Sequence, residues 1–191
     1  VLSRHGARTP TNLSFYPVGD YPWKDILAPG ALTSLGKAQM RVMGHRYQYI
    51  FEDLAHQKVE VFSSSKERAR LSAEAFVEGF FDGEEAAAAA VQVKDGLLRP
   101  DSPELKKLLI EKERTPEYER KARGDFAHLM DAFRLTEIGQ LRELGDVIIS
   151  NKVHDLPLPF TDRADELAKE VRRLALVLHI NPLSISIAIH L

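Results

Sequence analysis

The amino-acid sequence predicts an α/β fold in which helices pack on a parallel-rich sheet. Two short apolar stretches, residues 1–3 and 58–62, have the pattern of buried strands. Each stretch precedes a segment whose apolar residues recur at helical spacing. The resulting order of strand, loop, helix, strand and helix is typical of parallel sheets covered by helices.

The first helix is predicted to begin at Thr33 and to end near Asp53. Threonine is a good N-cap residue, because its hydroxyl accepts a hydrogen bond from a free backbone N–H of the first turn. The apolar positions expected to face the core are Leu35, Val42, Met43, Tyr47 and Ile50. The serines at 63–65 are expected to cap a second helix, from about Lys66 to Phe81.

The segments around and after these elements are of two kinds. Residues 11–31 are rich in proline and glycine, so we expect a loop over the mouth of a site. Residues 82–150 are charged and rich in helix-forming residues. Within them we expect helices near 103–113, 116–133 and 136–150, most of whose residues have no part in chemistry.

Composition places the chain among soluble globular domains. Its 191 residues are 44% hydrophobic, enough for a real core, and one domain with a helical subdomain is expected. The net charge of −2 and the pI near 6.4 give no reason to expect nucleic acid or a membrane surface as partner. No apolar run approaches the ~20 residues of a membrane span. The first predicted strand includes residue 1, and the sequence does not begin with Met, so we expect a trimmed N-terminus.

Two features bear on the cellular compartment in opposite ways. The chain has no cysteine, which weakens a lysosomal or secreted assignment, although a domain of this size does not need disulfides. Residues 12–14 read NLS, an N-glycosylation acceptor sequence that would suit a luminal protein.

The most informative stretch is residues 4–10, which read RHGARTP directly after the first predicted strand. Catalytic groups often lie where a strand ends in an open α/β sheet, and Gly6 allows a sharp turn there. Arg4 and Arg8 can each present a planar fork of donors to phosphate oxygens. Their charges oppose protonation of His5, leaving a ring nitrogen free to attack phosphorus.

This stretch resembles the RHGxRTP signature of the histidine acid phosphatases, which belong to branch 2 of the histidine phosphatase superfamily. Two later stretches resemble the same family: GALTSLGKAQ at 30–39 is similar to its LTxxGxxQ pattern, and RARLSAEAF at 68–76 to its RxxxSAxxF pattern. Together they cover residues 1 to about 81, and the spacing of YPW at 21–23 is most similar to the lysosomal and venom-type acid phosphatases. The match thins beyond that point.

The resemblance implies a single histidine acid phosphatase-like domain over 1–191, with residues 82–150 as a helical insert that shapes the substrate entrance. It implies hydrolysis of phosphomonoesters through a phosphohistidine on His5, with Arg4 and Arg8 binding the phosphate and no metal or cofactor. Small molecules and phosphoproteins are the expected substrates, and a homodimer is one option for assembly. The implied location is lysosomal or secreted, as a glycoprotein.

Two departures from the family concern site residues. A third arginine normally ends the second strand, where this chain has Phe62, and Lys66, Arg68 or Arg70 would have to replace it. We expect Arg68 to do so, helped by the free N–H groups of the helix start. The aromatic residue followed by two serines at 62–64 is also similar to some inositol-pyrophosphate phosphatase-like domains.

The second departure is at the C-terminus. The alternating stretch LSISIAIH, residues 183–190, resembles the family strand that ends in a catalytic His-Asp pair, so His190 is a candidate catalytic residue. Leu191 stands where the aspartic acid belongs, and the lead-in LPLPFT at 156–161, before a helix at 162–178, is followed by little of the usual additional segment. We therefore expect a domain incomplete at both ends. A phosphate-binding pseudoenzyme is the alternative function, because a positioned acid is worth ~10²–10⁴-fold in rate.

Overall fold

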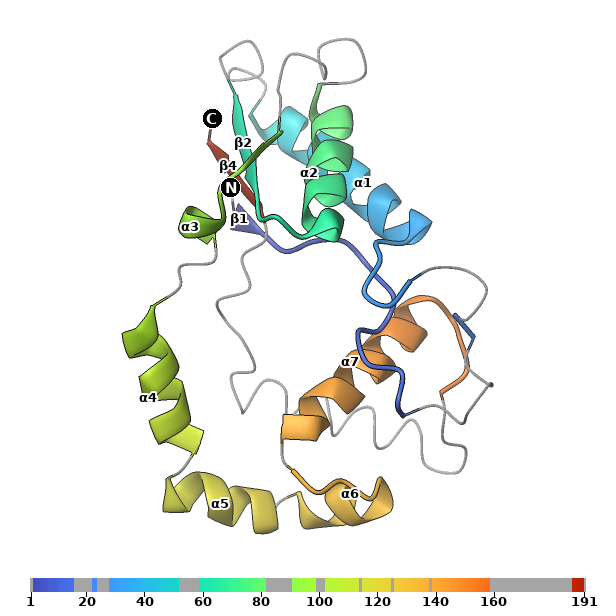
Figure 1. Cartoon of the computed structure of the whole chain (residues 1–191). Coiled ribbons are helices and arrows are strands. Elements are labelled where there is room, and N and C mark those ends of the chain that lie inside the picture. The colour runs from blue at the N-terminus through green and yellow to red at the C-terminus, as the bar shows by residue number, and fades with distance from the viewer. Residues whose placement is uncertain are drawn as a thin grey trace.

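The structure is a computed structural model of the whole chain, shown in Figure 1. It describes residues 2–15, 22–23, 28–51, 59–81, 91–98, 102–113, 115–124, 126–137, 139–158 and 187–190. The helix expected at 162–178 lies outside these residues. No helix among the described residues is both long enough and apolar enough to span a bilayer.

Four short strands form one sheet. They are β1 (Leu2–Ser3), β2 (Glu60–Ser63), β3 (Val91–Val93) and β4 (Ile187–His190), in the spatial order β1-β4-β2-β3. β2 and β3 pair in parallel, whereas β4 is antiparallel to both β1 and β2. β1, β2 and β3 therefore all run in one direction, which confirms the α/β fold with a parallel-rich sheet. β3 had not been expected, and β4 makes the sheet mixed.

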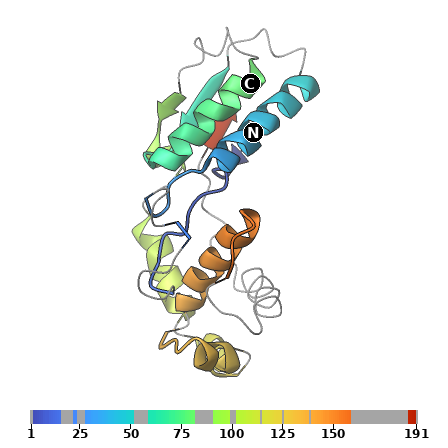
Figure 2. The same cartoon turned by 90° about the vertical axis from the view of Figure 1, so that its right-hand side faces the viewer.

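Two helices cover one face of this sheet, as Figure 2 shows. They are α1 (Ser34–Ile50) and α2 (Glu67–Phe80), which confirms both expected helices to within a few residues. Thr33 is the N-cap of α1, and its side chain accepts a hydrogen bond from the backbone N–H of Gly36 at 3.1 Å. The N-cap of α2 is Lys66, which makes no capping hydrogen bond with its side chain, so the predicted serine cap is wrong.

The buried face of α1 differs in part from the predicted one, since Met43 and Tyr47 pack against the core as expected but other residues do not. Leu35, Val42 and Ile50 are 38%, 51% and 63% exposed, whereas Met40 and two glycines are buried. The reason is close packing against α2: a Cβ on Gly44 would lie 2.2 Å from the carbonyl oxygen of Phe76. The spacing of large apolar residues does not indicate a helix face that is buried because its glycines allow close packing. The core between the two helices and the sheet contains Met40, Val61, Ala73, Ala75, Phe76, Val77 and Phe80.

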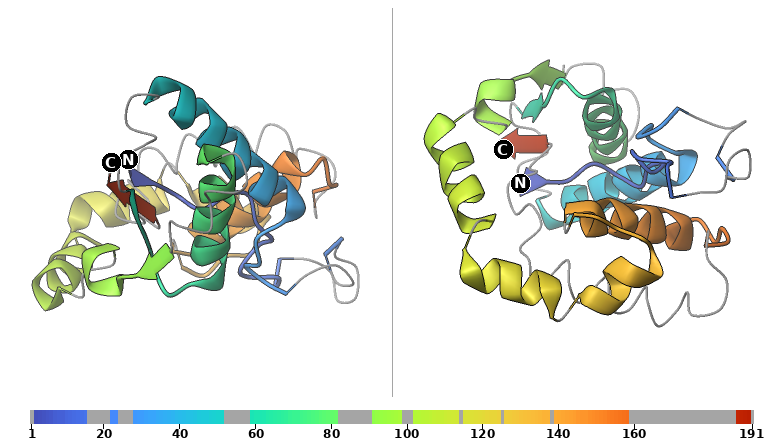
Figure 3. Two further views of the ribbon diagram at one scale, coloured as in Figure 1. Left: turned by 90° about the horizontal axis from the view of Figure 1, so that it is seen from above. Right: turned by 60° about the horizontal axis from the view of Figure 1, so that its bottom comes forward.

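The rest of the described chain is helical, and Figure 3 shows that it curves away from the sheet and returns beside the loop that follows β1. Its helices are α3 (Asp95–Leu98), α4 (Pro103–Glu113), α5 (Pro116–Arg123), α6 (Ala127–Ala132) and α7 (Gly139–Val153). The single helix expected over 116–133 is two helices, because the first ends at Arg123, directly before Gly124, a residue type that favours helix termination. α6 and α7 share a second core built from Phe126, Leu129, Leu141, Leu144 and Ile148.

Candidate active site

The loop after β1, residues 4–12, is held in place by hydrogen bonds from several elements. The backbone N–H of Gly6 donates to the Ser72 hydroxyl on α2 at 3.1 Å, and that of Ala7 donates to the Gln39 side chain on α1 at 2.9 Å. The N–H of Thr9 donates to the carbonyl of Ala31 at 3.0 Å. Gln39 and Ser72 belong to the stretches whose resemblance to the family was noted, so those stretches position this loop.

Two glycines allow the loop to lie directly against the first turn of α1. A Cβ on Gly6 would be 2.3 Å from the carbonyl oxygen of Gly36, and a Cβ on Gly36 would be 2.0 Å from that of Ala7. Real side chains do not tolerate such distances, so backbone would have to move for any other residue at either position. Glycine is thus required at position 6 and at position 36 for the same steric reason, which is the close contact between the loop and α1.

His5 is partly buried, and its tautomer is fixed by the backbone. Its Nδ1 lies 2.8 Å from the carbonyl oxygen of Gly6, which can only accept, so Nδ1 carries the hydrogen. Nε2 is therefore the nitrogen with the free lone pair. Burial, together with the charges of Arg8, Arg4 and Arg68, lowers the pKa of His5 to about 4, although its hydrogen bond to Gly6 acts in the opposite direction. The ring is neutral at any pH well above that value.

Arg8 is fixed by a carboxylate from the helical part of the chain. Its two terminal nitrogens donate to the two oxygens of Asp146 on α7, at 2.7 and 3.0 Å, and one also donates to the carbonyl of Thr9 at 2.8 Å. Asp146 further accepts from the backbone N–H and the hydroxyl of Thr11, both at 3.1 Å. The side chains of Arg8 and Asp146 are 10% and 23% exposed, so this ion pair is largely shielded from solvent.

The other two arginines predicted for the site also lie near His5. Burial lowers the pKa of Arg4, and the charge of Arg8 lowers it further. Arg68 lies at the start of α2, and its guanidinium reaches Gly30. The φ of Gly30 is 75°, a backbone angle that favours glycine. The structure therefore brings Arg4, Arg8 and Arg68 together around His5.

A fourth arginine, which the sequence analysis missed, lies in the same place. Arg142 on α7 is near enough to Arg4 to lower the pKa of Arg4. It is one helical turn ahead of Asp146, so the two residues share the face of α7 that meets the loop. No local sequence signal indicates either residue, since both are more than 130 positions away from the loop that they approach.

Phe62 occupies the position of the third family arginine and is turned into an apolar cluster. It is 8% exposed and packs against Leu98 of α3, and the Nζ of Lys94 lies 4.0 Å from the centre of its ring. Its neighbour Ser63 is fully buried, and its hydroxyl has no hydrogen-bond partner among the described residues. The end of β2 therefore presents no side-chain cation to the site.

The strand register does not bring His190 to His5. In the antiparallel pair of β4 and β2, His190 is opposite Glu60, at the start of β2, whereas Ile187 is opposite Ser63. Ile187 also pairs with Ser3, the residue before the loop. His190 thus lies at the end of β2 away from the loop that carries His5, because β4 is antiparallel to β1 and β2.

The helical part is also attached to the loop by a second set of contacts. The Nε1 of Trp23 donates to Asn151 at 3.0 Å, and the Trp23 ring meets the ring of His154 edge to face at 4.8 Å. His154 in turn contacts the hydroxyl of Thr33 at 2.8 Å, which joins the end of α7 to the cap of α1. Thr33 also donates to the carbonyl of Ala7, so these contacts link the end of α7 to the loop through the cap of α1.

His5 and Arg4 line an open groove of about 550 Å³ that runs beside α1. Much of its α1 wall is apolar, since it consists of Leu35, Ala38, Met40, Val42 and Met43 together with Gln39 and Arg46. Among the described residues, no group of three or more His, Cys, Asp or Glu side chains is arranged to hold a metal ion. The positive charge around His5 comes from arginines.

A histidine kept neutral among arginines at the end of a strand defines a site for an anion beside a nucleophile. The family model of the histidine phosphatase superfamily (branch 2) matches residues 1–137. The chain belongs to this superfamily, as the resemblance in residues 4–10, 30–39 and 68–76 had indicated. A search of curated proteins finds no significant match.

Three bacterial phytases have similar structures. They are the phytase of Citrobacter braakii (TM-score 0.63, 13% identity, covering 92% of this chain), apo phytase of Hafnia alvei (0.61, 16%, 90%) and the phytase of Klebsiella sp. ASR1 (0.62, 17%, 94%). At these identities the likeness establishes the fold. In each case the chain spans 58% of the phytase.

Proposed function

We propose that this protein hydrolyses phosphomonoesters through a phosphohistidine formed on Nε2 of His5. The observation that carries the proposal is the hydrogen bond from Nδ1 of His5 to the Gly6 carbonyl, which leaves Nε2 as a neutral nucleophile. The surrounding arginines give the site the charge that a phosphate dianion needs. The family assignment supports the same chemistry.

The reaction has two steps. In the first, Nε2 of His5 attacks phosphorus in line, the bond from phosphorus to the ester oxygen breaks, and the alcohol leaves after taking up a proton. In the second, water attacks the phosphohistidine, releases inorganic phosphate and returns the neutral imidazole. Arg4, Arg8 and Arg68 bind the non-bridging oxygens in both steps, and charge-assisted hydrogen bonds of this kind are about twice as strong as neutral ones.

We further propose that the hydrolysis is that of an acid phosphatase. With a pKa of about 4, His5 stays largely unprotonated at mildly acidic pH, where protonation of the leaving oxygen is easier. Asp146 is not placed to donate that proton, because both of its carboxylate oxygens accept hydrogen bonds from Arg8. The proton would come from water or from a group outside the described residues.

A second candidate function is phosphate binding without turnover. Two observations favour it: Phe62 takes no part in the site, and the register carries His190 away from His5. A protein of this kind would retain the arginines and His5 but lack a positioned acid. It would bind inorganic phosphate and release almost no product from an ester.

Turnover of p-nitrophenyl phosphate between about pH 4 and about pH 8 separates these candidates. The hydrolase requires activity that His5→Ala abolishes and that His45→Ala, a change at an exposed histidine of α1, leaves intact. Phosphate binding with no turnover by the wild-type chain would instead establish the binding protein. Phytate belongs in the same assay, since the structural neighbours are phytases and residues 62–64 resemble inositol-pyrophosphate phosphatase-like domains.

We also propose a lysosomal or secreted location with a glycan on Asn12, which rests on the resemblance to lysosomal and venom-type enzymes and on the acceptor sequence at 12–14. The Asn12 amide donates to Glu143 on α7, a contact that a glycan would replace. Treatment of the secreted protein with an N-glycosidase should raise its electrophoretic mobility, and Asn12→Gln should remove that change. An unchanged mobility in a eukaryotic host would contradict the proposal.

A further inference from the structure

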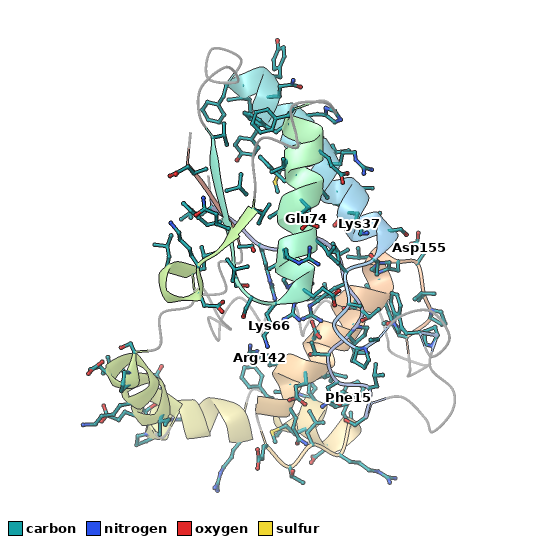
Figure 4. The ribbon with its side chains drawn as sticks, turned by 45° about the horizontal axis from the view of Figure 1, so that its top comes forward. Phe15, Lys37, Lys66, Glu74, Arg142 and Asp155 are labelled. Carbon is teal, nitrogen blue, oxygen red and sulfur yellow. The ribbon has the colours of Figure 1, made fainter. Side chains whose placement is uncertain are left out.

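Arg142 approaches the site from α7, on the helix face that holds Arg8. Asp146 is four residues further along this helix, and its carboxylate grips both terminal nitrogens of Arg8. Residues four apart lie above one another on a helix, so Arg142 is one turn nearer the helix start on the same face. Figure 4 shows its side chain extending from α7 toward the start of α2, where Lys66 lies.

The charges of Arg142 and Arg4 interact, although burial of Arg4 is the largest cause of its lowered pKa. Both Arg142 and Arg8 lower the pKa of Arg4, whereas Asp146 raises it. The contacts of Asp146 are with Arg8 and Thr11, so its carboxylate is already engaged. Arg142 is exposed and forms no ion pair with a described residue.

The charge of Asp146 offsets only part of this concentration of like charge, so a further anion would be favourable. Four arginines from three separate elements contribute charge here: Arg4 and Arg8 from the loop and Arg68 from α2 act on His5, and Arg142 from α7 acts on Arg4. Repulsion between them rises as solvent is excluded from the site. A bound phosphate dianion removes that repulsion and accepts the planar donor forks of the arginines.

We propose that Arg142 binds the transferred phosphate, supplying from the helical part of the chain the cation that the end of β2 lacks. β2 cannot supply it, because Phe62 is turned toward Leu98 and Ser63 carries no charge. The assignment rests on the proposed function, since it concerns the anion that His5 attacks. It makes α7 a part of the phosphate site in two ways, through Asp146 on Arg8 and through Arg142 on the ligand.

The test compares Arg142→Gln, Arg142→Lys and a charge-matched control, Arg120→Gln, whose exposed side chain lies on α5. Inorganic phosphate is titrated into each protein by calorimetry, and KM and kcat for p-nitrophenyl phosphate are measured in parallel. We expect Arg142→Gln to weaken phosphate binding about tenfold or more, Arg142→Lys to retain part of the affinity, and Arg120→Gln to match the wild type. Thermal unfolding of the variants excludes a general loss of structure.

The outcomes separate this inference from the function on which it rests. Phosphate binding by the wild type that Arg142→Gln leaves unchanged would overturn the role of Arg142 and leave the proposed function standing. No phosphate binding and no turnover by the wild type would overturn both. An equal loss of phosphate affinity in Arg120→Gln would show that only the net charge of the protein matters. That result would also overturn a direct contact between Arg142 and the phosphate.

Discussion

Arg8 and Asp146 are 138 residues apart in the sequence and form a two-pronged ion pair, with nitrogen-oxygen distances of 2.7 and 3.0 Å. The pair joins the loop that carries His5 to α7. The orientation of the Arg8 guanidinium, and with it one wall of the proposed phosphate site, is therefore set by a part of the chain that carries none of the recognised motifs.

Asp146→Asn should weaken this joint and lower both stability and activity. The pair is largely shielded from solvent, so we expect the free energy of unfolding to fall by roughly 1–3 kcal/mol. For a chain of this size that corresponds to a Tm lower by about 2–4 °C per kcal/mol. We also expect kcat/KM to fall about tenfold or more, because Arg8 loses its fixed orientation.

The matched control is Glu74→Gln. Glu74 pairs with Arg70 four residues away on α2, but both side chains are more than a third exposed, and such pairs contribute only about 0.3–0.5 kcal/mol. Thermal unfolding followed by circular dichroism, together with steady-state kinetics, measures both effects. Equal losses in the two variants would contradict the role assigned to Asp146.

The lowered pKa of His5 makes stability depend on pH. In the unfolded chain His5 has an ordinary pKa of about 6.5 and takes up a proton below it, whereas in the folded protein it stays neutral down to about 4. The unfolded state thus binds more protons between these two values, and stability falls as the pH is lowered through that window. The loss amounts to at most about 3–4 kcal/mol, since the two pKa values differ by about 2.5 and one pKa unit corresponds to about 1.36 kcal/mol.

Urea unfolding at about pH 7 and at about pH 4.5 measures this effect. His5→Gln should flatten the difference between the two values, since the neutral amide does not titrate. An equally steep pH dependence in His5→Gln and in the wild type would show that other groups cause it. Bound phosphate should reduce the dependence, because a neighbouring dianion favours the protonated ring.

Gly36→Ala should disturb the loop without touching any charged group. The new methyl group would lie 2.0 Å from the carbonyl oxygen of Ala7, so the loop or the start of α1 must shift. We expect a loss of kcat of about tenfold or more, because displacements of about 1 Å are costly in catalysis. Gly96→Ala is the control, since nothing lies within 4 Å of the added group there. Full activity in Gly36→Ala would contradict the close contact.

The sequence predicted the elements whose signals are local. The cap at Thr33, the helices that became α1 and α2 and the loop with His5 follow from adjacent residues. The buried face of α1 was predicted only in part, since glycines carry no hydropathy signal for a close helix contact. The direction of β4 depends on pairing across the sheet, which no local pattern specifies.

The site shows the same division. Arg4, Arg8 and Arg68 come from motifs within the first 80 residues, and the structure brings them together. Asp146 and Arg142 reach the site only through the return of the chain after the helical segment. Their roles depend on long-range packing, and nothing at positions 142–146 distinguishes them from ordinary charges on a helix surface.

The central claim is the phosphohistidine on His5, and the most direct measurement is to trap it. The wild type is mixed with a phosphomonoester, quenched under conditions that preserve phosphohistidine and digested for mass spectrometry, beside His5→Ala and His45→Ala. We expect a phosphoryl group on His5 in the wild type and in His45→Ala, and none in His5→Ala. Steady turnover with no phosphorylated His5, or with the phosphoryl group on another residue, would contradict the mechanism.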